Sequence, residues 1–270
     1  MTPARPVFFV SDHTGITAEI LGKSLLSQFP DEAFAYTSVP FVDSVEKAFF
    51  AAQQVKTAWK ESTLKPFVFS TLTDPGERAA LASSDAVVMD IYGHFLAMMV
   101  AEIGHPAIPL RGRFHSMQDS GSYGSRIDAV NFTLAADDGL GVEKYQLADL
   151  ILVGVSRSGK TPTSLYMAMQ YGLRVANYPL TPENFERPDL PDSLKPYLPK
   201  LRGLTLSPER LSQIRAERRP NSTYAALETC RQELRAAETM LHATGVPIVD
   251  STSRSVEEIA AMLRVKARGN

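Results

Sequence analysis

The sequence has little cysteine, little net charge and no long hydrophobic run, and each absence excludes a class of protein. Cys230 is the one cysteine among 270 residues, so an internal disulfide is excluded and a reducing, cytoplasmic setting is expected. The best candidate for a bilayer-spanning helix, residues 86–103, is broken by Asp90, His94 and Glu102, so no membrane span is expected. The formal net charge of −2 provides no basic field to attract nucleic acid or a membrane surface.

The remaining composition is that of an ordinary globular protein. Hydrophobic residues make up 44% of the chain and charged residues 21%, and 270 residues suffice for one large α/β domain or two modest ones. Arg5 precedes only a short apolar stretch at residues 7–10, which has the length of a strand and not that of a secretory signal.

The most informative stretch is residues 150–164, with the sequence LILVGVSRSGKTPTS. Gly154, Gly159, Lys160 and Thr161 match the phosphate-binding pattern G-x-x-x-x-G-K-[ST] in full. The apolar run before the loop predicts a parallel strand with both faces covered, and a helical segment follows at once. The alternative is a chance match on an ordinary strand–turn–helix, against which the correct order of all three elements argues.

The chemistry of this loop explains each residue type. The two glycines let the backbone curl, so that loop amides and the following helix N-terminus point at a phosphate. Lys160 supplies a positive charge to the terminal phosphates, and Thr161 supplies a hydroxyl for Mg²⁺. The predicted nucleotide-binding residues are Gly154, Val155, Ser156, Arg157, Ser158, Gly159, Lys160 and Thr161.

Alternation of strand-like and helix-like segments predicts an α/β fold, with a doubly wound, mainly parallel sheet followed by a P-loop kinase-like α/β domain. The expected domains are residues 1–140 and 141–270. The expected strands are residues 5–11, 34–42, 66–72, 86–91, 150–155, 173–176, 204–206 and 246–250. The expected helices include residues 16–29, 44–60, 93–103, 123–136, 163–171, 222–242 and 255–265, with further helices beginning at Pro75 and after Ser207. Residues 181–199 are rich in proline and predict a loop with short turns.

The polar turn after the first strand has two interpretations. Asp12, His13 and Thr14 lie where open α/β sheets place ligands, so they are candidates for a site. Alternatively, Asp12 or Thr14 only caps the next helix.

Three further groups of charged residues also leave two interpretations open. Residues 104–124, with His105, Arg111, Arg113 and His115, form either a basic contact for an acidic partner or a solvated connector. Asp137 and Asp138 end a helix unfavourably for its dipole, which indicates a role with Mg²⁺ or a hydroxyl, or a solvated acidic turn. The arginines after Ser207 indicate either a phosphate-contacting lid or a solvated basic face; they are Arg210, Arg215, Arg218 and Arg219. Apart from these three groups, Asp250 is a candidate for holding Mg²⁺ through water.

With these motifs in place, the chain resembles the phosphoenolpyruvate synthase regulatory proteins, which are grouped with the pyruvate, phosphate dikinase regulatory proteins. The resemblance covers nearly the whole chain, and its most specific block is GVSRSGKTPTSLYMAMQ at residues 154–170, followed by RVANYP at 174–179. Other shared stretches are SD at 11–12, TGITAE at 14–19, ADDG at 136–139, GLT at 203–205, PER at 208–210, Arg215 with ERR at 217–219, ST at 251–252 and SVEEI at 255–259. The TSLY and NYP stretches favour the synthase branch.

The resemblance implies two opposed activities on one protein partner, phosphoenolpyruvate synthase. Members phosphorylate a threonine beside the target's catalytic histidine with ADP as donor, and so inactivate the target. They also remove the phosphate with inorganic phosphate as acceptor and pyrophosphate as product. The family suggests a homodimer. His13 departs from the family's Ser-Asp-Gly-Thr, which puts the role of residues 12–14 in doubt if that position needs a positive φ.

The expected mechanism places the ADP β-phosphate in the loop, with Lys160 holding it, Thr161 orienting Mg²⁺, and Asp137 or Asp138 accepting the proton of the target threonine. Two other classes compete with this hypothesis. One is a P-loop kinase acting on a small metabolite, and the other is a nucleotide-binding regulator without catalysis.

Overall fold

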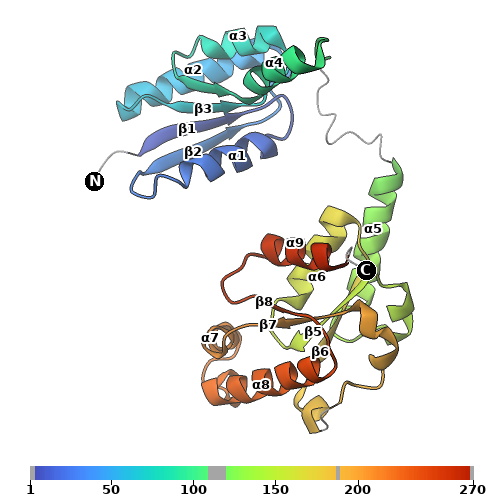
Figure 1. The fold of residues 1–270 in the computed structure, drawn as a ribbon. Helices are drawn as coiled ribbons and strands as arrows, with labels where there is room; N and C mark the ends of the chain where they lie inside the picture. The colour runs from blue at the N-terminus through green and yellow to red at the C-terminus, as the bar shows by residue number, and fades with distance from the viewer. Residues whose placement is uncertain (1–3, 109–119, 187–188, 268–270) are drawn as a thin grey trace. The chain divides into compact units, whose positions relative to one another are not determined.

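Two compact units make up the chain, and their division falls between residues 116 and 117 (Figure 1). The computed structural model describes residues 4–108, 120–186 and 189–267. Each unit is built on a four-stranded parallel sheet, so the predicted α/β class is confirmed. Within the described ranges, no helix is both long and apolar enough to cross a membrane.

The N-terminal unit is a doubly wound sheet with strand order β2-β1-β3-β4. Its strands are β1 (Arg5–Val10), β2 (Phe34–Val39), β3 (Phe67–Ser70) and β4 (Val87–Asp90), and its helices are α1 (Ile16–Leu26), α2 (Val45–Ser62), α3 (Pro75–Ala82) and α4 (Ile91–Ile103). Side chains alternate between the faces of β1. Phe8 and Val10 pack with α2 and α3, whereas Val7 and Phe9 pack with α1. Figure 1 shows α2 and α3 on one side of this sheet and α1 on the other.

Helix starts in this unit follow the side-chain chemistry of their first residues. Ser44 caps α2 by accepting from the Lys47 amide, and Asp74 caps α3 by accepting from the amides of Gly76 and Glu77. Pro75 stands at the first position of α3, where its missing N–H leaves no bond unmade. Both starts agree with the prediction from the sequence.

The C-terminal unit repeats the parallel design with strand order β6-β5-β7-β8. Its strands are β5 (Leu150–Val155), β6 (Val175–Leu180), β7 (Leu201–Thr205) and β8 (Ile248–Asp250). Its helices are α5 (Ser120–Ala135), α6 (Lys160–Tyr171), α7 (Pro208–Arg218), α8 (Leu227–Ala243) and α9 (Val256–Ala267), and short 3₁₀ turns span Val142–Leu147, Pro182–Glu186, Lys195–Lys200 and Thr223–Ala225.

Strand β5 lies between β6 and β7 and is buried along its whole length. Alternate side chains of β5 pack against α8 on one face and against α6 and α9 on the other. Covering both faces excludes water from the strand, and the loop that follows β5 therefore starts from a rigid support.

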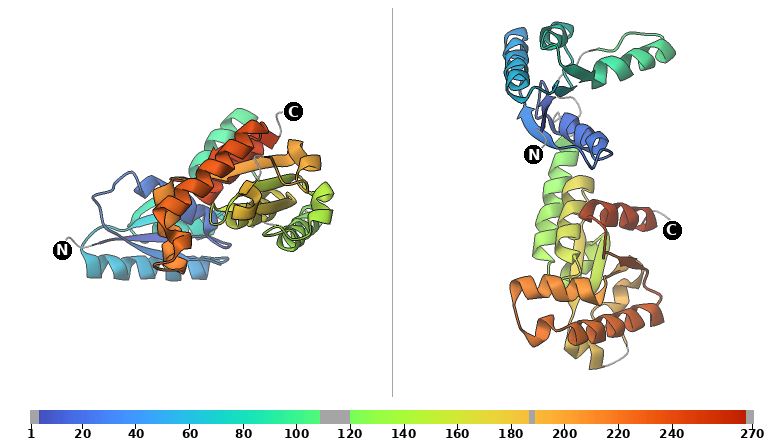
Figure 2. Two further views of the ribbon diagram at one scale, coloured as in Figure 1. Left: turned by 90° about the horizontal axis from the view of Figure 1, so that it is seen from below. Right: turned by 90° about the vertical axis from the view of Figure 1, so that its left-hand side faces the viewer.

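The division of the chain differs from the predicted boundary at residue 140. Helix α5 packs against α6 and β6, beside which it lies in two views (Figure 2). The apolar surface that α5 covers belongs to the second sheet, so residues 117–140 fall within the C-terminal unit.

Strand β6 is longer than the predicted strand at residues 173–176, because it continues through Asn177, Tyr178 and Pro179. Among the residues that the structure describes, it is an edge strand with β5 as its one partner. A proline is tolerated there because its missing N–H leaves no ladder bond unmade on the open side.

The single helix predicted at residues 222–242 is divided in two. A 3₁₀ turn at Thr223–Ala225 comes first, and Ala226 has an extended ψ of 135° before α8 begins. The break turns Tyr224 toward Ser156 and Arg215, to which it is bonded. The expected short turns within residues 181–199 are present as the 3₁₀ segments at Pro182–Glu186 and Lys195–Lys200.

Candidate active site

The predicted phosphate-binding loop at residues 154–161, called the phosphate loop below, connects β5 to α6 at the carboxyl end of a central strand of the sheet, and its backbone explains its glycines. A Cβ on Gly154 would lie 2.4 Å from the main-chain oxygen of Leu204 on β7, so the sheet permits only glycine there. Gly159 has a φ of +90° and precedes α6 without a side-chain cap. The first amides of α6 are therefore directed at the loop, as anion binding requires.

Arg157 and Ser158 give the loop two unusual side chains. Arg157 has a φ of 75°, a left-handed conformation that costs a non-glycine residue about 1–3 kcal/mol and is found mainly at functional sites. Ser158 is 1% exposed, and its hydroxyl makes no hydrogen bond within the described part of the chain. Strain and an unpaired buried hydroxyl both mark the loop as shaped for a ligand.

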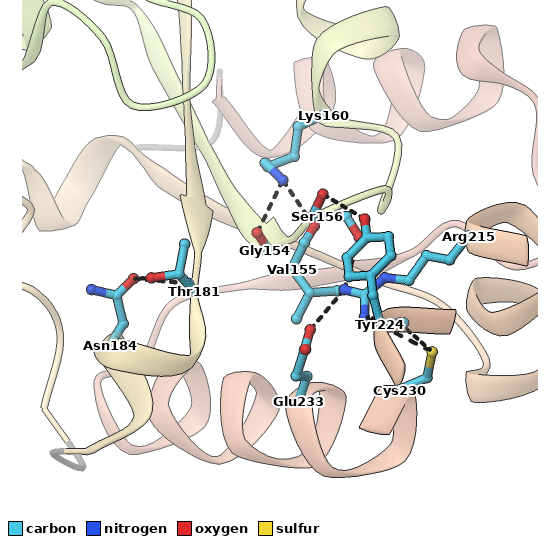
Figure 3. Close-up of polar contacts among 10 residues, drawn as sticks. All are labelled: Gly154, Val155, Ser156, Lys160, Thr181, Asn184, Arg215, Tyr224, Cys230 and Glu233. Carbon is cyan, nitrogen blue, oxygen red and sulfur yellow. Dashed lines mark hydrogen bonds and ion pairs between the residues drawn. The ribbon is translucent and has the colours of Figure 1, made fainter. Parts of the chain in front are cut away.

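Lys160 is only 5% exposed and folds back onto the loop. Its Nζ donates to the carbonyl oxygens of Gly154 at 3.0 Å and Val155 at 2.9 Å (Figure 3). Burial lowers its pKa to about 8, against the opposing pull of Asp138 and Asp137. The two aspartates favour the charged form of this lysine, which makes it a candidate for contacting a phosphate.

Asp137 lies beside Thr161 and forms the acidic side of the site. The Thr161 hydroxyl donates to Asp137 Oδ1 at 2.9 Å, and the side-chain amide of Asn177 donates to the same oxygen. Asp138 has a φ of 55°, and its backbone N–H donates to Asn177 Oδ1 at 3.0 Å. The structure thus brings Asp137, Thr161 and the backbone of Asp138 together, as the sequence hypothesis requires.

Asn177 is the residue that sequence reasoning missed. It is fully buried on β6 and fixes the Asp137–Asp138 turn through both its side chain and its backbone, which exchanges hydrogen bonds with Ala136 and Gly139. Its polarity within an apolar strand was the available signal, since a buried amide needs partners. The strand predicted from the sequence ends at residue 176, so Asn177 is not counted as part of it.

Ser251 and Asp250 follow β8 and differ in their relation to the loop. The Ser251 hydroxyl donates to the carbonyl oxygens of Ser158 at 3.2 Å and Thr205 at 3.0 Å, which ties the phosphate loop to the end of β8. The carboxylate of Asp250 accepts instead from the amide and hydroxyl of Thr252. Those bonds lower its pKa. Ser251 is a second residue that sequence reasoning missed.

The four arginines after Ser207 differ in their surroundings. Arg210 bonds Gln213 on its own helix, and Arg215 is fully buried. Arg215 donates to the carbonyl oxygens of Ser156 at 3.2 Å and Tyr224 at 3.1 Å, and it is paired with Glu233 at 2.7 Å (Figure 3). Arg218 and Arg219 are exposed and line a hollow of about 250 Å³ together with Ser156 and Tyr224.

In the N-terminal unit, the turn after β1 does not cap α1. The helix begins after Gly15, which has a φ of 80° and no side-chain cap, so the capping interpretation of Asp12 and Thr14 is wrong. The Asp12 carboxylate accepts from the hydroxyl of Thr73 at 2.7 Å and thereby joins the loops that follow β1 and β3. His13 is not among the residues with positive φ, so it replaces the family's glycine without strain.

Residues 109–119 of the segment at residues 104–124 lie outside the described residues, and these include Arg111, Arg113 and His115. His105 is exposed and precedes this range. The hypothesis of a basic contact for an acidic partner therefore stays a prediction.

A glycine-rich loop on a buried central strand, with a lysine and a threonine at the start of the next helix, defines the class. The C-terminal unit has the fold of a P-loop kinase-like α/β protein.

Comparison with known proteins then identifies the family. A family model described as "Kinase/pyrophosphorylase" matches residues 7–263, and the chain belongs to this family, which places it among kinase-type phosphotransferases. A protein of Aromatoleum aromaticum is 50% identical over 270 residues, covering 100% of this chain and 98% of the relative. A relative from Azoarcus sp. is 49% identical over 269 residues, covering 99% of this chain and 97% of the relative. A relative from Thiobacillus denitrificans is 50% identical over 258 residues, covering 96% of this chain and 97% of the relative. All three are named, provisionally, phosphoenolpyruvate synthase regulatory protein.

Proposed function

We propose that the chain is a bifunctional regulator of phosphoenolpyruvate synthase, a serine/threonine kinase that uses ADP and a phosphorylase that uses inorganic phosphate. The names of the relatives support the target, and the family description joins a kinase with a pyrophosphorylase. The observation that carries the proposal is the loop after β5, where buried Lys160 and the Thr161–Asp137 pair meet at one helix N-terminus.

In the kinase direction, the hydroxyl oxygen of the target threonine attacks the β-phosphorus of ADP. A new P–O bond forms, the bond from the β-phosphorus to its bridging oxygen breaks, and AMP leaves. Lys160 exchanges its two carbonyl acceptors for phosphate oxygens, and its charge stabilises the transferring group. Loop amides supply the remaining hydrogen bonds.

The residues present fit a magnesium ion. Proteins bind Mg²⁺ through one or two carboxylates together with phosphate oxygens, and the side-chain oxygens of Thr161 and Asp137, 2.9 Å apart, are ligands of that type. The ion would neutralise charge on the phosphates. Asn177 would keep the Asp137 carboxylate oriented toward it.

The two aspartates are suited to different tasks. Asp137 Oδ1 already accepts from Thr161 and Asn177, which suits a positioning role. The carboxylate of Asp138 is exposed and has no hydrogen bond or ion pair among the residues that the structure describes. Asp138 is therefore the better base, and it takes the proton that the target threonine loses.

The reverse activity needs no second nucleotide. An oxygen of inorganic phosphate attacks the phosphorus of the phosphothreonine, the bond to the threonine oxygen breaks, and pyrophosphate forms. The threonine oxygen recovers a proton from Asp138, which has taken that proton up from solvent before the transfer. Lys160 and the loop amides would bind the pyrophosphate product as they bind two phosphates of a nucleotide.

The decisive assay combines the purified chain with Mg²⁺, histidine-phosphorylated phosphoenolpyruvate synthase and ADP radiolabelled on its β-phosphorus. We expect label on a target threonine and its release as pyrophosphate once orthophosphate is added. Transfer only from ATP to a small acceptor would contradict the proposal and favour a metabolite kinase. Nucleotide binding without any transfer would favour a regulator without catalysis.

Two matched variants test the division of roles. Asp138→Asn should lower kcat and leave the affinity for ADP near wild type, because it removes only the proton acceptor. Asp137→Asn should lower kcat too, and in addition it should weaken the dependence of the rate on Mg²⁺. Equal magnesium dependence in both variants would count against this assignment.

A further inference from the structure

The hollow beside the phosphate loop, lined by Ser156, Arg218, Arg219 and Tyr224, is not used by the mechanism above. We propose that it is a second anion subsite, which binds one phosphate-class group next to the nucleotide. Its ligand is either free orthophosphate or the phosphate monoester of a phosphorylated protein side chain. The inference rests on the proposed function, because it assumes that ADP occupies the phosphate loop itself.

The size of the hollow indicates a single anionic group. About 250 Å³ is below the range of roughly 300–1,000 Å³ that small-molecule sites occupy. The hollow therefore suits a single phosphoryl group better than a whole nucleotide. Ser156 belongs both to the phosphate loop and to the wall of the hollow, so an anion bound there would adjoin the phosphates of ADP.

The positive charge of the hollow comes from Arg218 and Arg219. Both are exposed, and neither is in an ion pair within residues 4–108, 120–186 and 189–267. Arg215, by contrast, forms an ion pair with Glu233 and donates hydrogen bonds to main-chain oxygens. Two adjacent guanidinium groups without a carboxylate partner suit the planar, paired hydrogen bonds that phosphate accepts.

The hydroxyls of Ser156 and Tyr224 provide a further donor. Their oxygens are 2.9 Å apart, and either atom can be the donor in that bond. The pair carries two hydroxyl protons and its mutual bond uses one, so the second is available to an oxyanion in the hollow. The neutral pair adds hydrogen bonding without the desolvation cost of another charge.

Arg215 makes this wall rigid. Its guanidinium carbon lies 4.1 Å from the centre of the Tyr224 ring, and its N–H groups bind the carbonyl oxygens of Ser156 and Tyr224. The loop and the 3₁₀ turn are thus fixed to one buried cation (Figure 3). Arg215 is a positioning residue, while Arg218 and Arg219 are the ligand-contacting ones.

The test is a calorimetric titration of orthophosphate into the full chain saturated with ADP. Arg218→Gln combined with Arg219→Gln should weaken orthophosphate binding by about tenfold or more, since each charge-assisted bond contributes on that order. The affinity for ADP should stay within about twofold. Arg210→Gln, an exposed arginine of the same helix that bonds Gln213, is the control and should change neither affinity.

Two further variants test whether orthophosphate is bound by specific hydrogen bonds or only by the positive charge of the hollow. The double lysine variant, Arg218→Lys with Arg219→Lys, keeps the charge and should recover part of the affinity. Tyr224→Phe should weaken binding severalfold, because it removes the spare proton. A double glutamine variant that binds orthophosphate as wild type does would overturn the subsite and leave the proposed function standing.

A second titration decides between the two sources of phosphate. A phosphothreonine peptide and its unphosphorylated form are titrated into the same ADP-saturated proteins. Dependence on Arg218 and Arg219 only for the phosphopeptide assigns the subsite to the protein substrate, and dependence only for orthophosphate assigns it to the free ion. If ADP fails to bind the wild type, the proposed function falls, but the effect of the double variant on orthophosphate binding still decides the subsite.

Discussion

The two units share a strand order and a left-handed glycine before the first helix, but the loops that contain this glycine carry opposite charges. In each unit, the loop after the first strand, β1 or β5, ends in a glycine with a left-handed backbone conformation. The φ angle is 80° at Gly15 and 90° at Gly159, and the helix that follows has no side-chain cap. The next residue is half-exposed Ile16 in one unit and buried Lys160 in the other. The shared topology places both loops at the edge of the sheet where ligands bind in such folds, and the positively charged side chains of the second loop are the ones proposed to bind a phosphate.

The loops also differ in how they are fixed. Asp12 joins its loop to Thr73 through a carboxylate, which would repel an anion. The main-chain oxygens of the phosphate loop are held by Ser251 and Arg215, and the carboxylate that the loop contacts, that of Asp137 on Thr161, is the one proposed to hold Mg²⁺. Structural support and ligand charge are thus matched in the C-terminal unit, which agrees with the general finding that function resides in sites and not in folds.

The largest effect is expected from Lys160→Ala, which tests whether the difference between the two loops depends on this lysine. Transfer from ADP should fall by about 10²- to 10³-fold, the usual effect of removing one group that stabilises developing charge. Ile16→Ala, at the corresponding position of the first loop, should leave the affinity for ADP within about twofold. Initial rates and ADP titrations check both, and a Lys160→Ala protein with a near wild-type rate would remove the basis of the comparison.

Burial of Lys160 also predicts a pH dependence of stability. Its pKa is about 8 in the folded chain and about 10.4 when unfolded, so between these values the unfolded chain holds more protons at this residue. The contribution of Lys160 to the unfolding free energy therefore rises with pH across that window.

Relative to wild type, Lys160→Met should consequently lose about 3 kcal/mol of stability as the pH is raised from about 7 to 10.5. Urea unfolding at several pH values measures it. Lys200 also donates to two main-chain oxygens but is only half-buried, so Lys200→Met is the control and should show a much smaller change. An equal change in both would show that burial of Lys160 is not the cause. In parallel, kcat/KM for ADP should decline above about pH 8.

The glycines should respond differently in the two units. Gly154→Ala places a methyl group 2.4 Å from a main-chain oxygen and should cost about 1–3 kcal/mol through overpacking. Gly15→Ala meets its nearest atom at 3.8 Å and should cost about 1 kcal/mol, from positive φ alone. Urea unfolding of the two variants compares them, and a larger cost at Gly15 would contradict the close approach at Gly154.

The smallest expected effect is that of Asp12→Asn. An amide still accepts from Thr73 but without charge assistance, so stability should fall by about 1 kcal/mol. The affinity for ADP should not change, because the phosphate loop is built without Asp12. Thermal unfolding and an ADP titration test the two statements, and weaker ADP binding would mean that the first loop also serves the nucleotide.

Sequence reasoning succeeded where a local pattern carries the physics. The loop at residues 154–161 and the helix starts at Ser44 and Pro75 are set by short-range sterics and hydrogen bonds, and the structure has them as expected. The β-branched and aromatic runs located the strands, with small differences at their ends.

The errors came from contacts between distant parts of the chain. Asn177 and Asp137 are 40 residues apart, and Arg215 and Ser156 are 59 apart, so no local pattern relates them. Helix α5 belongs to the second unit because of the surface that it covers, which its own periodicity does not reveal. Tertiary contacts likewise divided the helix expected at residues 222–242.

The single cysteine has a practical consequence. Cys230 is fully buried beside Arg215, and burial raises the pKa of its thiol, so maleimide dyes should react with it slowly. One cysteine introduced on the surface of each unit can therefore carry a donor and an acceptor fluorophore with little background labelling. Energy transfer between the two dyes would then report, in real time, how the separation of the units responds to ADP, orthophosphate and the protein substrate.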